Sequence, residues 1–126
     1  MVKPKTPRDT ALAAAFVAES RRRLQDEYLA KLRTALRGMA PADLWWRPYP
    51  NANSIANLLL HLDGNVRQWI LAGVGGARDR RDRDAEFAAR SGDTGRVLLT
   101  RLASTLASVD HVLARLGPNE LLEQRR

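Results

Sequence analysis

Apolar residues recur three and four positions apart in three long segments of the chain, at about 9–37, 54–72 and 94–116. This spacing places them along one face of an α-helix, so each segment is predicted to be an amphipathic helix. Each helix is predicted to begin at a side-chain oxygen that accepts a free backbone N–H: Asp9 or Thr10, Asn53 or Ser54, and Asp93 or Thr94. No alternation typical of a β-strand is found along the sequence.

Glycines mark the predicted ends of these helices, at Gly38, at residues 73–76 and at Gly117, which Pro118 follows. The predicted core residues of the first helix fall at multiples of four: Leu12, Phe16, Leu24, Tyr28, Leu32 and Leu36. Ala15 and Leu29 widen this stripe. Those of the second helix are Ile55, Leu58, Leu59, Leu62, Val66, Trp69 and Ile70. Together these segments predict an all-α, up-down helical bundle. The apolar stripes are wide enough for four helices, but only three main helices are present and a fourth segment barely starts after residue 118.

The remaining segments are predicted to be connections. Pro41 can open a short helical turn, because proline fits the first position of a helix. Trp45, Trp46 and Tyr49 follow, and we expect them to cover one end of the bundle as a hydrophobic plug. The residues at 77–84 alternate in charge and are predicted to be a solvated loop.

Chain length and composition predict one domain. The chain has 126 residues and a mass of 14.1 kDa, which corresponds to a single core. Residues 1–8 contain two prolines and no core residue, so they are predicted to be a flexible leader to a domain at 9–126. The absence of cysteine from the sequence excludes a disulfide framework and a cysteine nucleophile. We find no apolar run of the length of a membrane span and no signal peptide, and we expect a cytoplasmic protein.

The net charge of +7 raises the question of a nucleic-acid partner. Eighteen of the 21 basic residues are arginine, a bias that a GC-rich genome also produces. Aspartates at 79, 82 and 84 offset the arginines of the densest basic loop, whereas a groove that follows phosphates normally lacks such acids. We therefore do not expect nucleic acid as the partner.

His61 is the main candidate for chemistry. It shares one face of the second helix with Leu58, Asn65 and Trp69, and inward-facing histidines of this kind bind metal in helical bundles. The alternative is a histidine at the edge of the core, bonded to a neighbouring polar group. His111, the other histidine, has no second histidine four residues away, and we expect it to be solvated.

Part of the sequence resembles a bacterial protein family. The residues that carry the resemblance are Trp46-Arg47-Pro48, the stretch from Asn53 to Ile70 with Asn-Leu-Leu-Leu-His-Leu-Asp-Gly-Asn at its centre, Gly73-Val74-Gly75-Gly76, Arg80 to Arg83, and Glu86-Phe87. The chain is similar here to the DinB-like (YfiT-like) proteins, which include metal-dependent hydrolases and thiol-dependent transferases. The resemblance covers about residues 16–122 and is most specific over 45–87.

The resemblance implies a four-helix bundle and a divalent zinc or nickel ion held by three histidines. His61 matches the histidine of the second helix, and we expect Trp46, Asn65 and Trp69 to line a pocket near it. The other two histidines belong to a His-x-x-x-His pair in a fourth helix, which this sequence lacks. The metal site is therefore incomplete in this chain, and whether the chain is an enzyme stays open.

Two interpretations follow for the function. In the first, the chain is a DinB-like protein with His61 as the remaining metal ligand, either as a fragment or as a naturally shortened member. In the second, it is a metal-free oligomerisation or binding module without catalytic activity. In both, the missing helix exposes an apolar groove, which we expect a second copy of the chain to cover as a dimer or larger homo-oligomer.

Overall fold

The computed structural model describes residues 6–125, and this part of the chain is helical without strands. The elements are α1 (Pro7–Arg21), a π-helical segment η1 (Arg22–Glu27), α2 (Tyr28–Leu36), α3 (Pro41–Leu44), α4 (Ile55–Val66), a second π-helical segment η2 (Arg67–Ala72), α5 (Arg83–Ala88), α6 (Gly95–Ala114) and α7 (Pro118–Leu121). The prediction of an all-α bundle is confirmed.

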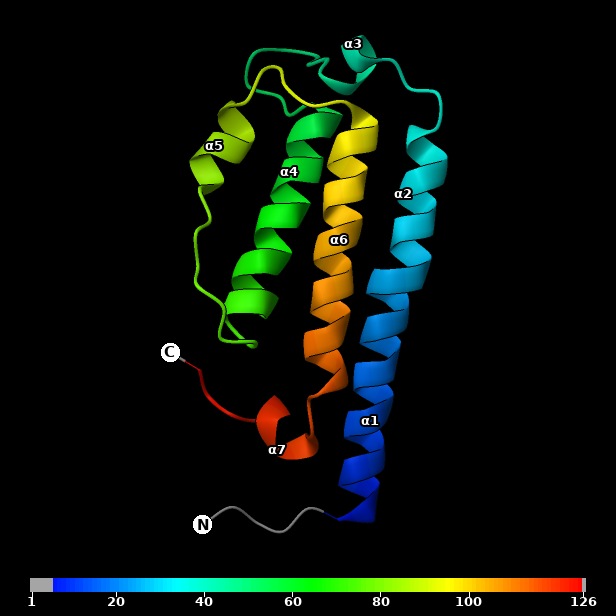
Figure 1. Ribbon diagram of the computed structural model, residues 1–126, viewed down its shortest axis with the longest axis vertical. Coiled ribbons are helices and arrows are strands. Elements are labelled where there is room, and N and C mark those ends of the chain that lie inside the picture. The colour runs from blue at the N-terminus through cyan, green and yellow to red at the C-terminus, as the bar shows by residue number, and fades with distance from the viewer. Residues whose placement is uncertain (1–5, 126) are drawn as a thin grey trace.

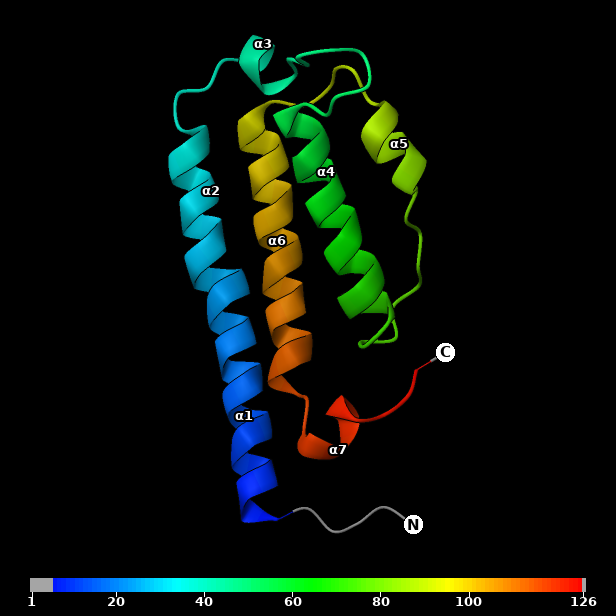
Figure 2. The ribbon, with the colours of Figure 1, turned by 180° about the vertical axis from the view of Figure 1, so that it is seen from behind.

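Three long helical columns lie side by side (Figure 1). The first is continuous from α1 to α2, and α6 lies between it and α4 in both views (Figures 1 and 2). The segment from 73 to 94 runs back along α4 and carries α5 against it, so α4 and α6 point in the same direction. The order is therefore up, down and down again rather than a strict alternation. This return path places α5 beside α4, where the candidate site lies.

The first column begins earlier than the sequence predicts. Thr6 is the N-cap, Pro7 takes the first helical position, and the side chains of Thr6 and Asp9 bond to each other's backbone N–H. Asp9 thus belongs to the first turn, as the partner of a cap three residues earlier. Of the predicted leader, residues 1–5 lie outside the described part of the chain.

The predicted stripe of the first column is wrong at several positions. Leu12 is 70% exposed and Phe16 63%, while the neighbouring Val17 is buried. Tyr28 is 44% exposed, whereas Leu29, which was predicted to widen the stripe, is buried. A helix turns once in 3.6 residues, so a strict four-residue spacing advances about 40° past each full turn and winds around the helix. The helix positions that face the core therefore change along the column.

The core is centred on α6. Its buried side chains are Leu98, Leu102, Thr105, Leu106, Val109 and Leu113, and they pack against buried residues of the other two columns, including Leu29 and Leu59. No membrane span is predicted from the sequence, yet α6 is long and apolar enough to cross a membrane by length and composition alone. The apolar residues that give α6 this composition include the leucines that are buried at the centre of the bundle.

The prediction for the connection after α2 is confirmed in part. Gly38 has a φ of 72°, which ends α2, and Pro41 opens the short helix α3. Leu44 is the residue that fills the end of the bundle, at 1% exposure. Trp46 and Tyr49 are about two-thirds exposed, at 65% and 64%, so the expected aromatic plug is wrong for these two residues.

An ion pair joins α1 to α6 and makes stability depend on pH. The Arg21 Nε lies 2.8 Å from Asp110 Oδ1, and the Arg21 guanidinium holds the pKa of Asp110 below its ordinary 3.8. A carboxyl with a lowered folded pKa stabilises the fold above its ordinary value, and this contribution is lost as the pH falls. We expect Asp110→Asn to cost about 0.2–1 kcal/mol at pH 7 and less below pH ~3. Urea unfolding at both pH values measures this, with Asp43→Asn as the control.

Candidate functional site

α4 begins with a polar cap that also fixes α5. The Ser54 hydroxyl accepts the backbone N–H of Asn57, and the Asn57 side chain in turn accepts the Ser54 N–H. The Asn57 amide donates to the carbonyls of Glu86 (2.8 Å) and Ala89 (2.9 Å) and is fully buried. These two hydrogen bonds fix the C-terminal end of α5 against the first turn of α4.

Arg47 binds the same C-terminal end of α5. Its guanidinium donates to the carbonyls of Ala52, Phe87 and Ala89 at 2.7–2.9 Å. The backbone carbonyls that α5 leaves free at its C-terminal end thus receive donors from two segments. This bonding sets the position of Glu86 and Phe87 next to α4.

Glu86 and Arg81 form a buried ion pair over the middle of α4. The Arg81 Nε and one terminal nitrogen donate to the two carboxylate oxygens of Glu86, each at 3.0 Å. Their side chains are only 6% and 10% exposed. The Glu86 carboxylate raises the pKa of Arg81, so the guanidinium stays charged. Gly64 gives the Glu86 carboxylate its space on α4, because a Cβ at this position would overlap Glu86 Oε2.

Two further side chains hold Arg81 in place. Its remaining terminal nitrogen donates to Gln68 Oε1 at 3.0 Å, and Gln68 donates to Asp79 at 2.9 Å. Asp79 also accepts the backbone N–H of Arg81, and this bond lowers the pKa of the carboxyl, as does the one from Gln68. The loop predicted to be solvated thus contributes a buried arginine, and α5, which the sequence analysis did not predict, starts directly after it with Asp82 as its N-cap.

His61 lies against this ion pair. Its Nδ1 is 3.0 Å from the terminal nitrogen of Arg81 and 3.3 Å from Glu86 Oε1, and its ring lies 4.9 Å from that of Phe87. A guanidinium can only donate, so Nδ1 accepts from Arg81 and the proton of the neutral ring is on Nε2. When the proton is on Nδ1 instead, Glu86 Oε1 is placed to accept it. Arg81 and Glu86 therefore support opposite tautomers of His61.

The outer nitrogen of His61 is the one available to a ligand. Among residues 6–125, Nε2 has no hydrogen-bond partner, and the side chain is 29% exposed. The same face of α4 carries Leu58 and Leu62, at 48% and 41% exposure, and Trp69 follows in η2 at 63%. The predicted core stripe of the second helix is therefore wrong at these three positions. We refer to these three apolar residues as the α4 strip. A polypeptide that covers this strip also covers His61.

Asn65, Trp46 and His111, which the sequence analysis also considered, lie in three different places. Asn65 is half-buried on α4, one turn beyond His61. Trp46 lies in the connection between α3 and α4 and takes no part in the hydrogen bonds that the described residues make with His61. His111 is near the end of α6, where its Nε2 faces Arg115 at 2.8 Å, in a different part of the bundle.

Sequence reasoning did not identify Arg81, Glu86 or Gln68 as neighbours of His61. Arg81 and Glu86 are 20 and 25 positions away from it, and no helical spacing connects them. The family resemblance was the available indication, since the residues that carry it include Gln68, Arg81 and Glu86.

The described residues do not form a complete metal centre. Among residues 6–125, no three histidine or acidic side chains are grouped so that they could hold an ion. Both oxygens of Glu86 accept hydrogen bonds from Arg81. Among the described residues at this place, His61 Nε2 is then the atom that remains free to coordinate a metal. Three or four protein ligands are the norm for zinc.

The fold and this site define a DinB-like helical bundle. A family model described as Mycothiol-S-transferase matches residues 22–126, and the chain belongs to this family. The match includes α2, α4, α5 and α6, and therefore all residues of the His61 site. No curated protein and no solved structure matches the chain.

Proposed function

We propose that this chain takes part in transferring a low-molecular-weight thiol, of which mycothiol is the first candidate, and that His61 is the reactive imidazole. The family match supports the reaction class. The observation that carries the residue assignment is the Arg81–Glu86 pair, which holds Nδ1 of His61 and leaves Nε2 free. The lack of cysteine is compatible with a cytoplasmic location, which we include in the proposal.

In this proposal His61 binds or moves a proton at the sulfur of the thiol. With Nδ1 bonded to Arg81, Nε2–H can donate to a sulfur or oxygen. With Nδ1–H bonded to Glu86, Nε2 can accept a thiol proton or bind a metal. A histidine whose far nitrogen is held by a carboxylate is the usual arrangement for both roles.

A second copy of the chain completes the site in this proposal. The family resemblance implies a zinc or nickel ion at His61, and the described residues lack the further ligands that such an ion needs. The α4 strip is apolar, exposed and next to His61, so association through it removes apolar area from water and encloses the imidazole. No catalytic step is assigned to the metal.

The assay uses mycothiol and monochlorobimane, in which a C–S bond forms, a C–Cl bond breaks and the thiol proton is released. We expect His61→Ala to lower the rate by about 100-fold or more, because general acid–base groups contribute this much. His111→Ala is the matched control and is expected to keep the rate. Equal rates for the wild type and His61→Ala, with both folded, would reject the assignment.

The second candidate function is a metal-free oligomerisation or binding module. The α4 strip supports it equally, because the strip is apolar whether or not a metal binds. In that case the oligomer mass and the melting temperature are expected to be the same with and without EDTA. A loss of mass or of melting temperature on chelation would instead favour the metal-containing form.

A further inference from the structure

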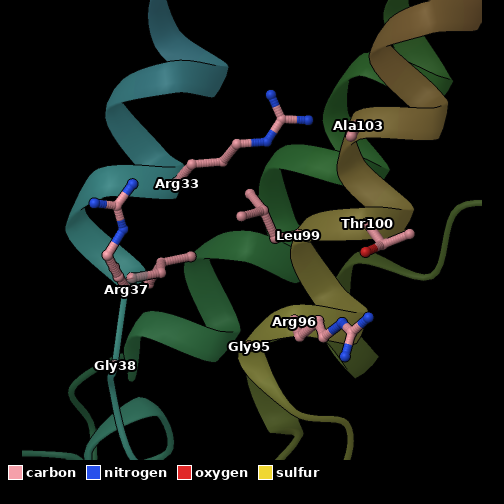
Figure 3. A pocket seen from close by; sticks show the side chains of 9 residues that line it. Arg33, Arg37, Gly38, Gly95, Arg96, Leu99, Thr100 and Ala103 are labelled. Atoms are coloured by element: carbon pink, nitrogen blue, oxygen red, sulfur yellow. The ribbon is translucent and has the colours of Figure 1, made fainter.

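A cavity lies between the end of α2 and the start of α6 (Figure 3). Its volume is about 480 Å³, which is in the range of small-molecule sites. The residues that line it are Arg33, Leu36, Arg37, Gly38, Gly95, Arg96, Leu99, Thr100 and Ala103. None of them belongs to α4 or α5, so the cavity shares no residue with the His61 site.

The cavity has an apolar floor that is fixed by the core. Leu36, Leu99 and Ala103 pack against the buried cluster that contains Leu98 and Leu102. These side chains come from two columns that already contact each other through the core. The floor is therefore formed without a ligand and can contact the apolar part of one.

The charge around this floor is uniformly positive. Arg33, Arg37 and Arg96 line the cavity together with no aspartate or glutamate. Among residues 6–125 none of the three has a hydrogen-bond or ion-pair partner, whereas Arg21, Arg67, Arg81 and Arg101 are all paired with a carboxylate. Unpaired arginines around one hollow are unfavourable to each other unless an anion separates them.

The start of α6 adds to the positive potential. α6 has 20 residues, and the backbone N–H groups of Gly95 and Arg96 have no acceptor among the described residues. Arg33 and Arg37 offset the negative end of α2, but Arg96 stands at the positive end of α6, where a cation is unfavourable. The helix dipole thus explains the arginines on α2 and does not explain Arg96.

We propose that this cavity binds a small organic anion with an apolar body and at least two carboxylate or phosphate groups. Arg33 extends over Leu99 toward α6, while the guanidinium groups of Arg37 and Arg96 point outward on opposite sides (Figure 3). One compact anion cannot reach all three groups in these positions. Several acidic groups spaced around an apolar centre can engage them, with the centre on Leu36, Leu99 and Ala103.

The test is a titration of the full chain with benzene-1,3,5-tricarboxylate, followed by amide chemical shifts. We expect saturable shifts at Gly38, Gly95, Arg96 and Thr100, and an affinity that falls as salt is raised. Citrate has the same three carboxylates without the ring and is expected to bind more weakly. Pyrophosphate, titrated in the same way, distinguishes phosphate from carboxylate groups as the preferred chemistry.

The double variant Arg33→Gln/Arg37→Gln is expected to weaken binding at least tenfold. Arg78→Gln/Arg80→Gln removes the same charge from two other exposed arginines and is expected to have little effect. All four side chains are exposed, so both variants are expected to fold, which the melting temperature checks. Equal weakening in the two variants, shifts spread over the basic surface, or equal affinity for citrate would overturn the proposal. Duplex DNA binding without a tricarboxylate response at these amides would overturn it as well.

Discussion

Replacing Arg81 by methionine is expected to lower the free energy of unfolding by about 3–5 kcal/mol. The substitution leaves the Glu86 carboxylate, which is 10% exposed, without its two donors, and it removes the donors to Gln68 and His61. An uncompensated buried charge is among the most destabilising single changes in a folded protein. Urea denaturation followed by circular dichroism gives the difference.

Two matched variants identify the cause. In Arg81→Met/Glu86→Gln both charges are removed, so we expect much of the lost stability to return. Arg67→Met breaks an ion pair with Asp63 whose arginine is 50% exposed, and we expect a loss of less than about 1 kcal/mol. A loss for Arg81→Met no larger than that for Arg67→Met would show that the buried pair does not stabilise the fold.

The second large effect is expected from the centre of the bundle. Leu102 is 2% exposed and lies in the cluster that joins the three columns, so Leu102→Ala is expected to cost about 2–5 kcal/mol. Leu12→Ala removes the same atoms from a side chain that is 70% exposed, and we expect a change within about 0.5 kcal/mol. The pair is compared by urea denaturation.

Leu12 also tests the sequence interpretation directly. The four-residue pattern places Leu12 in the core of the first column, whereas the structure leaves it on the surface. A loss of about 2 kcal/mol or more for Leu12→Ala would favour the predicted stripe or an oligomer that buries this residue.

The helices could be predicted from the sequence because their signals are local. Ser54 and Thr94 were expected as caps, and Gly38 as a terminator, and the structure has all three in these roles. A cap or terminator acts on a backbone only a few residues away, so the sequence contains the whole interaction. The start of α1 was missed because Pro7 and Asp9 act together with Thr6, outside the apolar pattern.

The site could be predicted only at His61. Its helix and its face were evident from the 3.6-residue period, but its partners come from a loop and a short helix that run back along α4. Arg81 is one of several arginines in an alternating charged segment, and nothing local distinguishes it from Arg80 or Arg83. Arg81 differs from these two because the path of the chain brings it next to Gly64. The absence of a Cβ at Gly64 leaves space there for the Glu86 carboxylate.

We propose above all that His61 belongs to a site that is completed when a second copy of the chain covers the α4 strip. The most direct measurement is a zinc or nickel titration of the full chain, with the mass of the same samples determined by light scattering. We expect an oligomer that binds metal, loses this binding with His61→Ala and keeps it with His111→Ala. A strictly monomeric chain at micromolar concentration, or metal binding that His61→Ala does not change, would contradict it.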